Sequence, residues 1–280
     1  MKSRISGVFG SLPFRGDLEG HRVLNVYCTA GYPKLDSTLE VMKALQENGA
    51  DIIELGMPYS DPLADGPVIQ HSGSVALANG MTIAKLFEQL KDFRNNSHSG
   101  PARAGTDGDG GGISIPVILM GYMNPVLQYG FEKFCADAAA IGIDGLILPD
   151  LPEYEFETEY GAVIKKYNLD FIFLVTPETS EERIKKLDSL STGFLYAVSS
   201  SSTTGGEKST SASQEYLLQL KNLKLQNPVL VGFGIKDKAS FDAVCQLADG
   251  AIIGSAYIKV LENSTNVNAA TKNFLSSILH

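Results

Sequence analysis

Hydrophobic residues along the chain gather in eight short runs that favour β-strands. Turn residues bound these runs, and most of the residues within them are aliphatic. Strands that are apolar on both faces are typical of a parallel sheet covered by helices. The runs occupy residues 23–28, 51–55, 116–120, 145–148, 171–175, 194–198, 228–231 and 251–253.

Amphipathic segments with helical periodicity separate these runs. They lie at residues 35–46, 83–93, 131–140, 155–167, 180–190, 214–225 and 239–247. This alternation in 280 residues predicts an α/β fold. We expect one (β/α)8 TIM-barrel domain over residues 1–280, with an extra N-terminal helix. Alternation alone does not close a barrel, so a doubly wound open sheet is the alternative.

Two polar, Gly-containing segments fall on opposite ends of such a barrel. Loops that follow strands lie at the catalytic face, and loops that follow helices lie at the other face. Residues 95–112 follow a helical segment, so we expect a flexible insertion on the non-catalytic face. Residues 199–213 follow the sixth strand and contain almost no apolar residue, which favours a mobile lid.

A carboxylate stands inside the second apolar run. Glu54 lies among Ile52, Ile53 and Leu55, and the loop that follows delivers Asp61 and Asp65. Burying an ionised, unpaired carboxylate costs several kcal/mol, so such a group is either paired or kept partly protonated. A partly protonated carboxyl is what a general acid needs, and an ion pair with a nearby Lys or Arg is the structural alternative.

Glycines at the ends of the last strands indicate a phosphate site. Gly234 follows the seventh strand, and Gly254 and Ser255 follow the eighth and open a helical segment. Loops at these two positions, with a helix N-terminus, often bind phosphate in barrels. Gly205 with Thr204, after the sixth strand, strengthens the pattern, although each glycine alone also suits a plain turn.

Composition excludes several classes of protein. The formal net charge is −9 and the basic residues form no stripe, which argues against nucleic-acid binding. The three cysteines are far apart and the four histidines form no close pair, so neither a disulfide framework nor a metal site is expected. The start of the chain lacks the features of a signal peptide, and no apolar run is long enough to span a membrane. We therefore expect a soluble cytoplasmic protein without metal.

Several motifs together resemble the alpha subunit of tryptophan synthase. The most specific is ELGMPYSDPLADGPVIQ at residues 54–70, which matches the family's signature around its catalytic glutamate. The resemblance covers nearly the whole chain. It continues through YCTAGYP at 27–33, PVILMGYMN at 116–124, DGLILPDLP at 144–152, TP at 176–177, and residues 196–205, 232–235 and 250–255.

The resemblance implies a retro-aldol lyase that cleaves indole-3-glycerol phosphate to indole and glyceraldehyde 3-phosphate. Glu54 would be the acid/base, and Asp65 would stabilise positive charge at the indole nitrogen. Further implied roles fall on the indole slot (Tyr27, Ile69, Tyr122 and Tyr196), on a lid residue that bonds the aspartate (Thr204), and on the phosphate site (Gly205, Gly234, Gly254 and Ser255). Each aromatic residue also fits simple core or rim packing.

The resemblance also implies a partner. Family members work in an α2β2 complex with a beta subunit that carries pyridoxal phosphate, so no cofactor is expected in this chain. Residues 58–65 and 150–152 resemble the alpha-side contacts. The chain departs from many members at Ser200 and Ser202, where those carry an Arg and a Gly, which bears on how a lid would close.

Three other functions compete with this interpretation. Another phosphate-binding barrel enzyme, such as a sugar-phosphate epimerase or indole-glycerol-phosphate synthase, would need metal ligands or a catalytic lysine, and no strand interior here carries a Lys. A non-catalytic activator of a beta subunit would not need both Glu54 and Asp65. A stand-alone lyase that releases free indole remains open, and turnover with and without a beta subunit separates it from the coupled enzyme.

Overall fold

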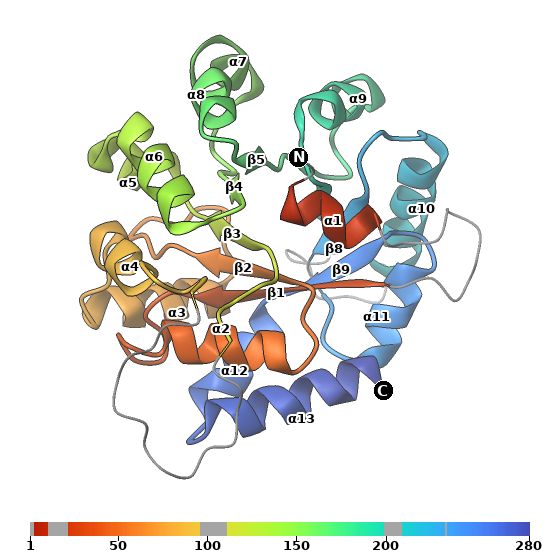
Figure 1. Ribbon diagram of the computed structural model, residues 1–280. Helices are drawn as coiled ribbons and strands as arrows, with labels where there is room; N and C mark the ends of the chain where they lie inside the picture. The colour runs from red at the N-terminus through yellow and green to blue at the C-terminus, as the bar shows by residue number, and fades with distance from the viewer. Residues whose placement is uncertain (1–2, 11–21, 96–110, 199–208, 233) are drawn as a thin grey trace.

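The computed structural model describes residues 3–10, 22–95, 111–198, 209–232 and 234–280 (Figure 1). Its strands are all parallel and follow the predicted runs closely. They are β1 Val23–Thr29, β2 Ile52–Gly56, β3 Val117–Met120, β4 Gly145–Ile147, β5 Asp170–Phe171, β6 Leu174–Val175, β7 Leu195–Val198, β8 Val229–Gly232 and β9 Gly250–Ile253.

The sheet closes on itself through the shortest strands. Its order is β5-β4-β3-β2-β1-β9-β8-β7-β6, and only Ile172 and Phe173 separate the two end strands in the chain. Ile172 donates its N–H to the carbonyl of Leu146 at 3.0 Å, and the carbonyl of Phe173 accepts from the N–H of Tyr196 at 3.0 Å. Residues 170–175 therefore form one interrupted strand that bonds both neighbours. The predicted barrel is confirmed, and the open-sheet alternative is wrong.

Alternate residues of each strand fill the inside of the barrel. This interior cluster is almost wholly aliphatic and aromatic, as close packing around a barrel axis requires. Its buried members are Ile5, Val23, Ile52, Ile118, Ile147, Ile172, Phe194, Tyr196, Leu230 and Ile252. The opposite strand faces pack against the surrounding helices and form the larger core.

The helices lie outside the barrel (Figure 1). They are α2 Thr38–Glu47, α3 Pro67–Ala78, α4 Ile83–Gln89, α5 Met123–Tyr129, α6 Phe131–Ile141, α7 Glu153–Glu155, α8 Gly161–Lys166, α9 Glu181–Leu190, α10 Ser209–Asn222, α11 Lys238–Cys245, α12 Ser255–Glu262 and α13 Val267–Leu279. No helix among the described residues is long and apolar enough to cross a membrane.

Several predicted helices differ from the observed ones in their extent, and the predicted segment 83–93, for example, ends at Gln89 as α4. The segment 155–167 is broken by a π-helical turn, Phe156–Tyr160, that joins α7 to α8. Gly161 accommodates this turn, since a Cβ there would lie 2.6 Å from the carbonyl oxygen of Phe156. Helix α10 begins at Ser209, so the last residues of the predicted lid are helical. The rest of that lid, residues 199–208, lies outside the described residues.

The predicted N-terminal helix is α1, Arg4–Gly10, and it covers the barrel end at which the strands begin (Figure 1). Ile5 is fully buried there, and Phe9 packs against Phe194 with ring centroids 6.3 Å apart. A Cβ on Gly193 would lie 2.8 Å from the Ile5 side chain, so this glycine lets the backbone approach the helix closely.

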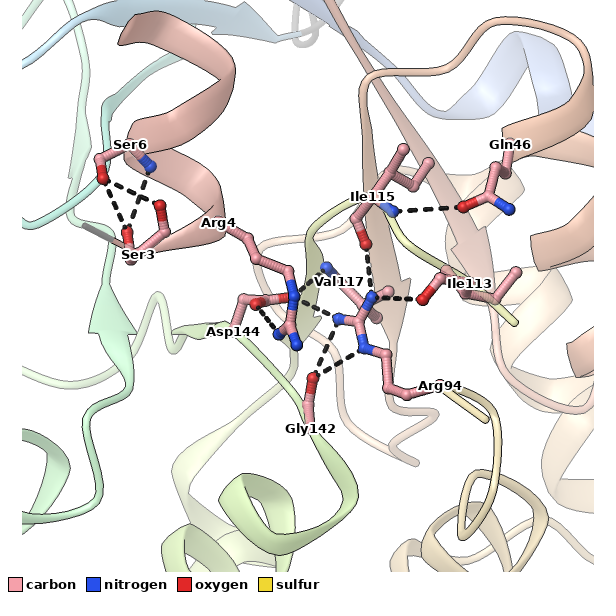
Figure 2. A network of polar contacts seen from close by, with 10 residues as sticks. All are labelled: Ser3, Arg4, Ser6, Gln46, Arg94, Ile113, Ile115, Val117, Gly142 and Asp144. Carbon is pink, nitrogen blue, oxygen red and sulfur yellow. Dashed lines mark hydrogen bonds and ion pairs between the residues drawn. The ribbon is translucent and has the colours of Figure 1, made fainter. Parts of the chain in front are cut away.

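Arg94 fastens the same end of the barrel (Figure 2). Its guanidinium donates to the carbonyls of Ile113, Ile115 and Gly142 at 2.7–3.1 Å and pairs with Asp144, whose carboxylate also accepts from the N–H of Val117. These partners all immediately precede β3 or β4. The predicted insertion at residues 95–112 begins and ends beside these contacts of Arg94. Residues 96–110 lie outside the described residues.

Candidate active site

Glu54 lies in the middle of β2 with its side chain inside the barrel. The residue is 1% exposed, and its Cα pairs with that of Tyr27 on β1. The side-chain amide of Asn25 donates to Oε2 of Glu54 at 3.0 Å. Burial raises the pKa of this carboxyl to about 8, and the bond from Asn25 opposes that rise. A carboxyl with this pKa is protonated at neutral pH and can act as a general acid.

The loop after β2 delivers Asp65 to the same region. Asp65 is half-buried, and its N–H donates to the carbonyl of Pro62 at 3.1 Å. Burial raises its pKa to about 6, while a hydrogen bond from the Tyr122 hydroxyl lowers it. The charge of Asp65 raises the pKa of Glu54, which places the two carboxyls within electrostatic reach. Near pH 7 this pair combines a protonated Glu54 with an ionised Asp65.

Three of the predicted tyrosines surround these acids. Tyr27 and Tyr196 are buried, and this burial, together with the charges of both acids, raises the pKa of each phenol. Tyr122 is 8% exposed and accepts the N–H of Ala64 at 3.0 Å, so it fixes the loop that holds Asp65. Phenol rings beside a buried carboxyl offer flat apolar faces for an aromatic ligand.

Glycines leave the space that the two buried tyrosines fill. A Cβ on Gly56 would lie 2.0 Å from the Tyr27 hydroxyl, and one on Gly232 would lie 2.3 Å from the Tyr196 hydroxyl. The sequence analysis missed both positions. Each is the last residue of a strand, and a glycine that ends an apolar run is the signal that could have revealed them.

The predicted phosphate residues lie at the end of the barrel where the strands finish. Gly254 is the N-cap of α12 and Ser255 is its first residue. A Cβ on Gly254 would lie 3.5 Å from Tyr27 Cβ and 3.8 Å from the Ile69 side chain, so three predicted site residues meet here. Gly234 has a φ of +81°, which favours glycine. Thr204 and Gly205 lie outside the described residues.

A cavity of about 260 Å³ lies over the ends of β4 to β6. Its lining includes Ile172 and Leu174, which face the barrel interior, but neither Glu54 nor Asp65. The cavity therefore does not mark the position of the two acids, which their shifted pKa values single out instead. Among the described residues, no group of three or more His, Cys, Asp or Glu side chains could hold a metal ion.

Asn25 is the functional candidate that the sequence analysis missed. It is fully buried on β1 and supplies the hydrogen bond to Glu54 that the described structure records. Its signal in the sequence is the one that revealed Glu54, a polar residue inside an apolar strand. The partner could not be identified before the register of β1 against β2 was known.

Known proteins are similar to this chain over most of its length. A family model described as tryptophan synthase alpha chain matches residues 17–277. A tryptophan synthase alpha chain from Flavobacterium johnsoniae is 49% identical over 88% of this chain and 91% of its own length. One from Christiangramia forsetii is 48% identical over 91% and 94% of the two chains.

Solved structures are similar over nearly the whole length. The alpha subunit of tryptophan synthase from Legionella pneumophila has a TM-score of 0.81 and 34% identity, covering 99% of this chain and 97% of that one. An aminoacrylate-bound tryptophan synthase from M. tuberculosis gives a TM-score of 0.79 and 32% identity, with 99% coverage of both chains. The similarity therefore extends over both sequence and fold.

Proposed function

Because this chain belongs to the tryptophan synthase alpha chain family, whose members cleave indole-3-glycerol phosphate, we propose that Glu54 is its acid/base and Asp65 its charge-stabilising carboxylate. The reaction is a lyase step of tryptophan biosynthesis that releases indole and glyceraldehyde 3-phosphate. The observation that carries the residue assignment is a buried and a half-buried carboxyl with pKa values of about 8 and about 6.

Glu54 suits a reaction that moves one proton between two positions of the substrate. Cleavage of the carbon–carbon bond at indole C3 needs an electron sink, which protonation of C3 creates as an iminium ion at the ring nitrogen. The protonated Glu54 supplies that proton. Its carboxylate then takes the proton of the adjacent side-chain hydroxyl as the bond breaks, so the products form and Glu54 is regenerated.

Asp65 suits the charge that this step creates. Its pKa of about 6 leaves it ionised at neutral pH, and the Tyr122 hydroxyl holds it by a hydrogen bond. A fixed carboxylate beside the indole N–H stabilises the positive charge of the protonated ring. Since Asp65 is already oriented before the reaction, little reorganisation is needed when the charge develops.

The remaining assignments follow the same arrangement. We propose that Tyr27, Ile69, Tyr122 and Tyr196 line the slot for the indole ring. The phosphate would bind at Gly234, Gly254 and Ser255, where the N–H groups that begin α12 are available to an anion. Thr204 and Gly205 are proposed from the family resemblance alone.

The test of the proposed function is Glu54→Gln, which keeps the side-chain shape and removes the transferable proton. We expect cleavage, measured as indole released, to fall by about 10²–10⁴-fold or more. Binding of indole-3-glycerol phosphate, measured by calorimetry, should persist because the slot and phosphate site are unchanged. Turnover near the wild-type rate would contradict the assignment of Glu54.

We also propose that the chain assembles with a beta subunit in an α2β2 complex and passes indole to it. Pyridoxal phosphate belongs to that partner, since alpha chains of this family carry no cofactor. The loop that delivers Asp65 carries the most exposed large apolar residue in the described structure, Leu63, at 94%. We propose that this leucine lies in the surface that the beta subunit covers, because apolar side chains gather at the centre of protein interfaces.

Leu63→Glu tests this partner surface. We expect the variant to bind the beta subunit of the same organism about tenfold or more weakly, because a charge would be buried in the interface. Indole release by the isolated chain should not change. Leu218→Glu is the matched control, since Leu218 is 46% exposed on α10 and away from this loop. Equal binding by both variants would exclude the loop from the interface.

We propose a cytoplasmic location, which the cysteines support. Cys28, Cys135 and Cys245 are all free, and burial raises the pKa of each thiol to about 12. Buried unpaired thiols are typical of proteins from reducing compartments. Fractionation of the source cells, followed by an assay for indole release, tests this location.

A further inference from the structure

We propose that Asn25 is the positioning residue of Glu54, and that its side-chain amide holds the Glu54 carboxyl in place in both its ionised and its protonated form. The inference rests on the proposed role of Glu54 and assigns a further residue to the same reaction. Asn25 does not contact the reacting atoms. It acts through the hydrogen bond of 3.0 Å between its Nδ2 and Oε2 of Glu54.

The place of Asn25 in the barrel fits this role. Its Cα pairs with that of Ile52, two residues closer than Glu54 to the end where the strands begin. Asn25 therefore supports the carboxyl from the interior, and the side toward the substrate loops is left for the reaction. Val23 on β1 and Ile252 on β9 belong to the aliphatic cluster of this interior. A polar side chain in such a cluster destabilises the fold unless it is bonded, so packing alone does not explain Asn25.

The other end of the amide supplies a second observation. Oδ1 of Asn25 is buried and has no hydrogen-bond partner within the described part of the chain. In the observed orientation the amide N–H faces Glu54, which suits a carboxylate. When Glu54 is protonated its O–H becomes a donor. A half turn of the amide then brings Oδ1 to accept from it, and the buried oxygen gains its missing partner.

An amide is the neutral group that suits both steps of the proton cycle. A Lys or Arg at this position would hold Glu54 in its ionised form, and an Asp would compete for its proton. An aliphatic residue would hold neither form. The donated bond also favours the carboxylate that exists between the two proton transfers, and so limits the rise in pKa that burial causes.

The experiment measures kcat for indole release against pH in the full-length chain. Protonation of C3 uses the acid form of Glu54, so kcat falls as pH rises through the pKa of Glu54. This decrease is the falling limb of the plot of kcat against pH. In Asn25→Leu the donated bond is lost and the falling limb should move up by about one pH unit. A misplaced carboxyl should also lower kcat by about 10–100-fold, with KM unchanged because the residues proposed to bind the phosphate stay in place.

Asn25→Asp provides a second variant that keeps the side-chain shape and carries the test if Asn25→Leu does not fold. Two adjacent carboxyls share one proton, so its falling limb should move up further than that of Asn25→Leu. A falling limb at the wild-type pH in either folded variant would overturn the inference.

Two controls separate this inference from other outcomes. Thr271→Val removes a buried hydrogen bond of 2.8 Å to Tyr257 on the outer layer, so it should lower stability without moving the pH limb. If the falling limb moves as far in Thr271→Val as in the Asn25 variants, the role of Asn25 is only structural. Glu54→Gln tests the proposed function itself: if it is inactive while the Asn25 variants keep the wild-type limb, only the inference about Asn25 fails.

Discussion

At the scale of single residues, the burial that prepares Glu54 for catalysis also makes stability depend on pH. Its pKa rises from 4.5 to about 8 on folding, so the folded chain holds a proton that the unfolded chain releases between these values. Below pH 4.5 this group therefore does not change the stability of the folded chain. As the pH rises above 4.5 it lowers that stability, and above pH 8 the loss is complete.

Glu54→Gln removes this titration. We expect the variant to be more stable than the wild type at pH 8.5, by an amount on the order of a few kcal/mol, and to differ little from it at pH 4.5. Urea unfolding at the two pH values measures the difference. A variant with the same pH dependence as the wild type would show that Glu54 is not buried in the way described.

The residue scale also shows what the sequence could reveal of the site. Glu54 stood out because an acid in an aliphatic run needs an explanation, and the structure gives it the burial and shifted pKa that a general acid requires. The Gly56–Tyr27 and Asn25–Glu54 pairs could not be predicted. Both depend on which residues of β1 and β2 lie opposite each other, and hydrophobic periodicity does not contain that register.

At the scale of elements, α1 acts as a plug for the barrel end at which the strands begin. Ile5 is the residue through which it enters the interior cluster. Ile5→Ala should lower the free energy of unfolding by about 2–5 kcal/mol, because it leaves a cavity in a closely packed core. The rate of indole release by the folded protein should be unchanged, since the acids lie toward the other end.

Denaturant unfolding of Ile5→Ala measures this effect. Leu127→Ala is the control, because Leu127 is 47% exposed on α5 and its truncation should change stability by only about 0.5 kcal/mol. A loss in Ile5→Ala no larger than in the control would show that α1 does not close the barrel.

The strands were predicted well, but helices α3, α5 and α13 were not predicted from the sequence. Strand bounds agree within a residue or two, except that the predicted fifth strand is split into β5 and β6. The extension of α10 to Ser209 lies in a Ser- and Thr-rich stretch that has no apolar stripe. Local sequence favours a loop there, because such a stretch offers no periodic pattern from which a helix could be predicted.

At the scale of the whole molecule, closure of the sheet is what brings the site together. Alternating strands and helices predicted a parallel sheet but left the barrel and the open sheet as alternatives. The choice depends on residues 170–175, which bond β4 with one half and β7 with the other. Such a contact joins distant parts of the chain, so local pattern cannot show it.

Arg94 holds together the two points at which one surface segment leaves the barrel and returns to it. The guanidinium fastens the chain where it leaves the barrel and where it returns, and a Cβ on Gly112 would lie 2.4 Å from the Arg94 carbonyl oxygen. With the two ends held together, the length of residues 96–110 is nearly uncoupled from the fold, as doubling a loop costs only about 0.6 kcal/mol. An engineer therefore gains a position for a reporter domain at the end of the barrel away from the acids.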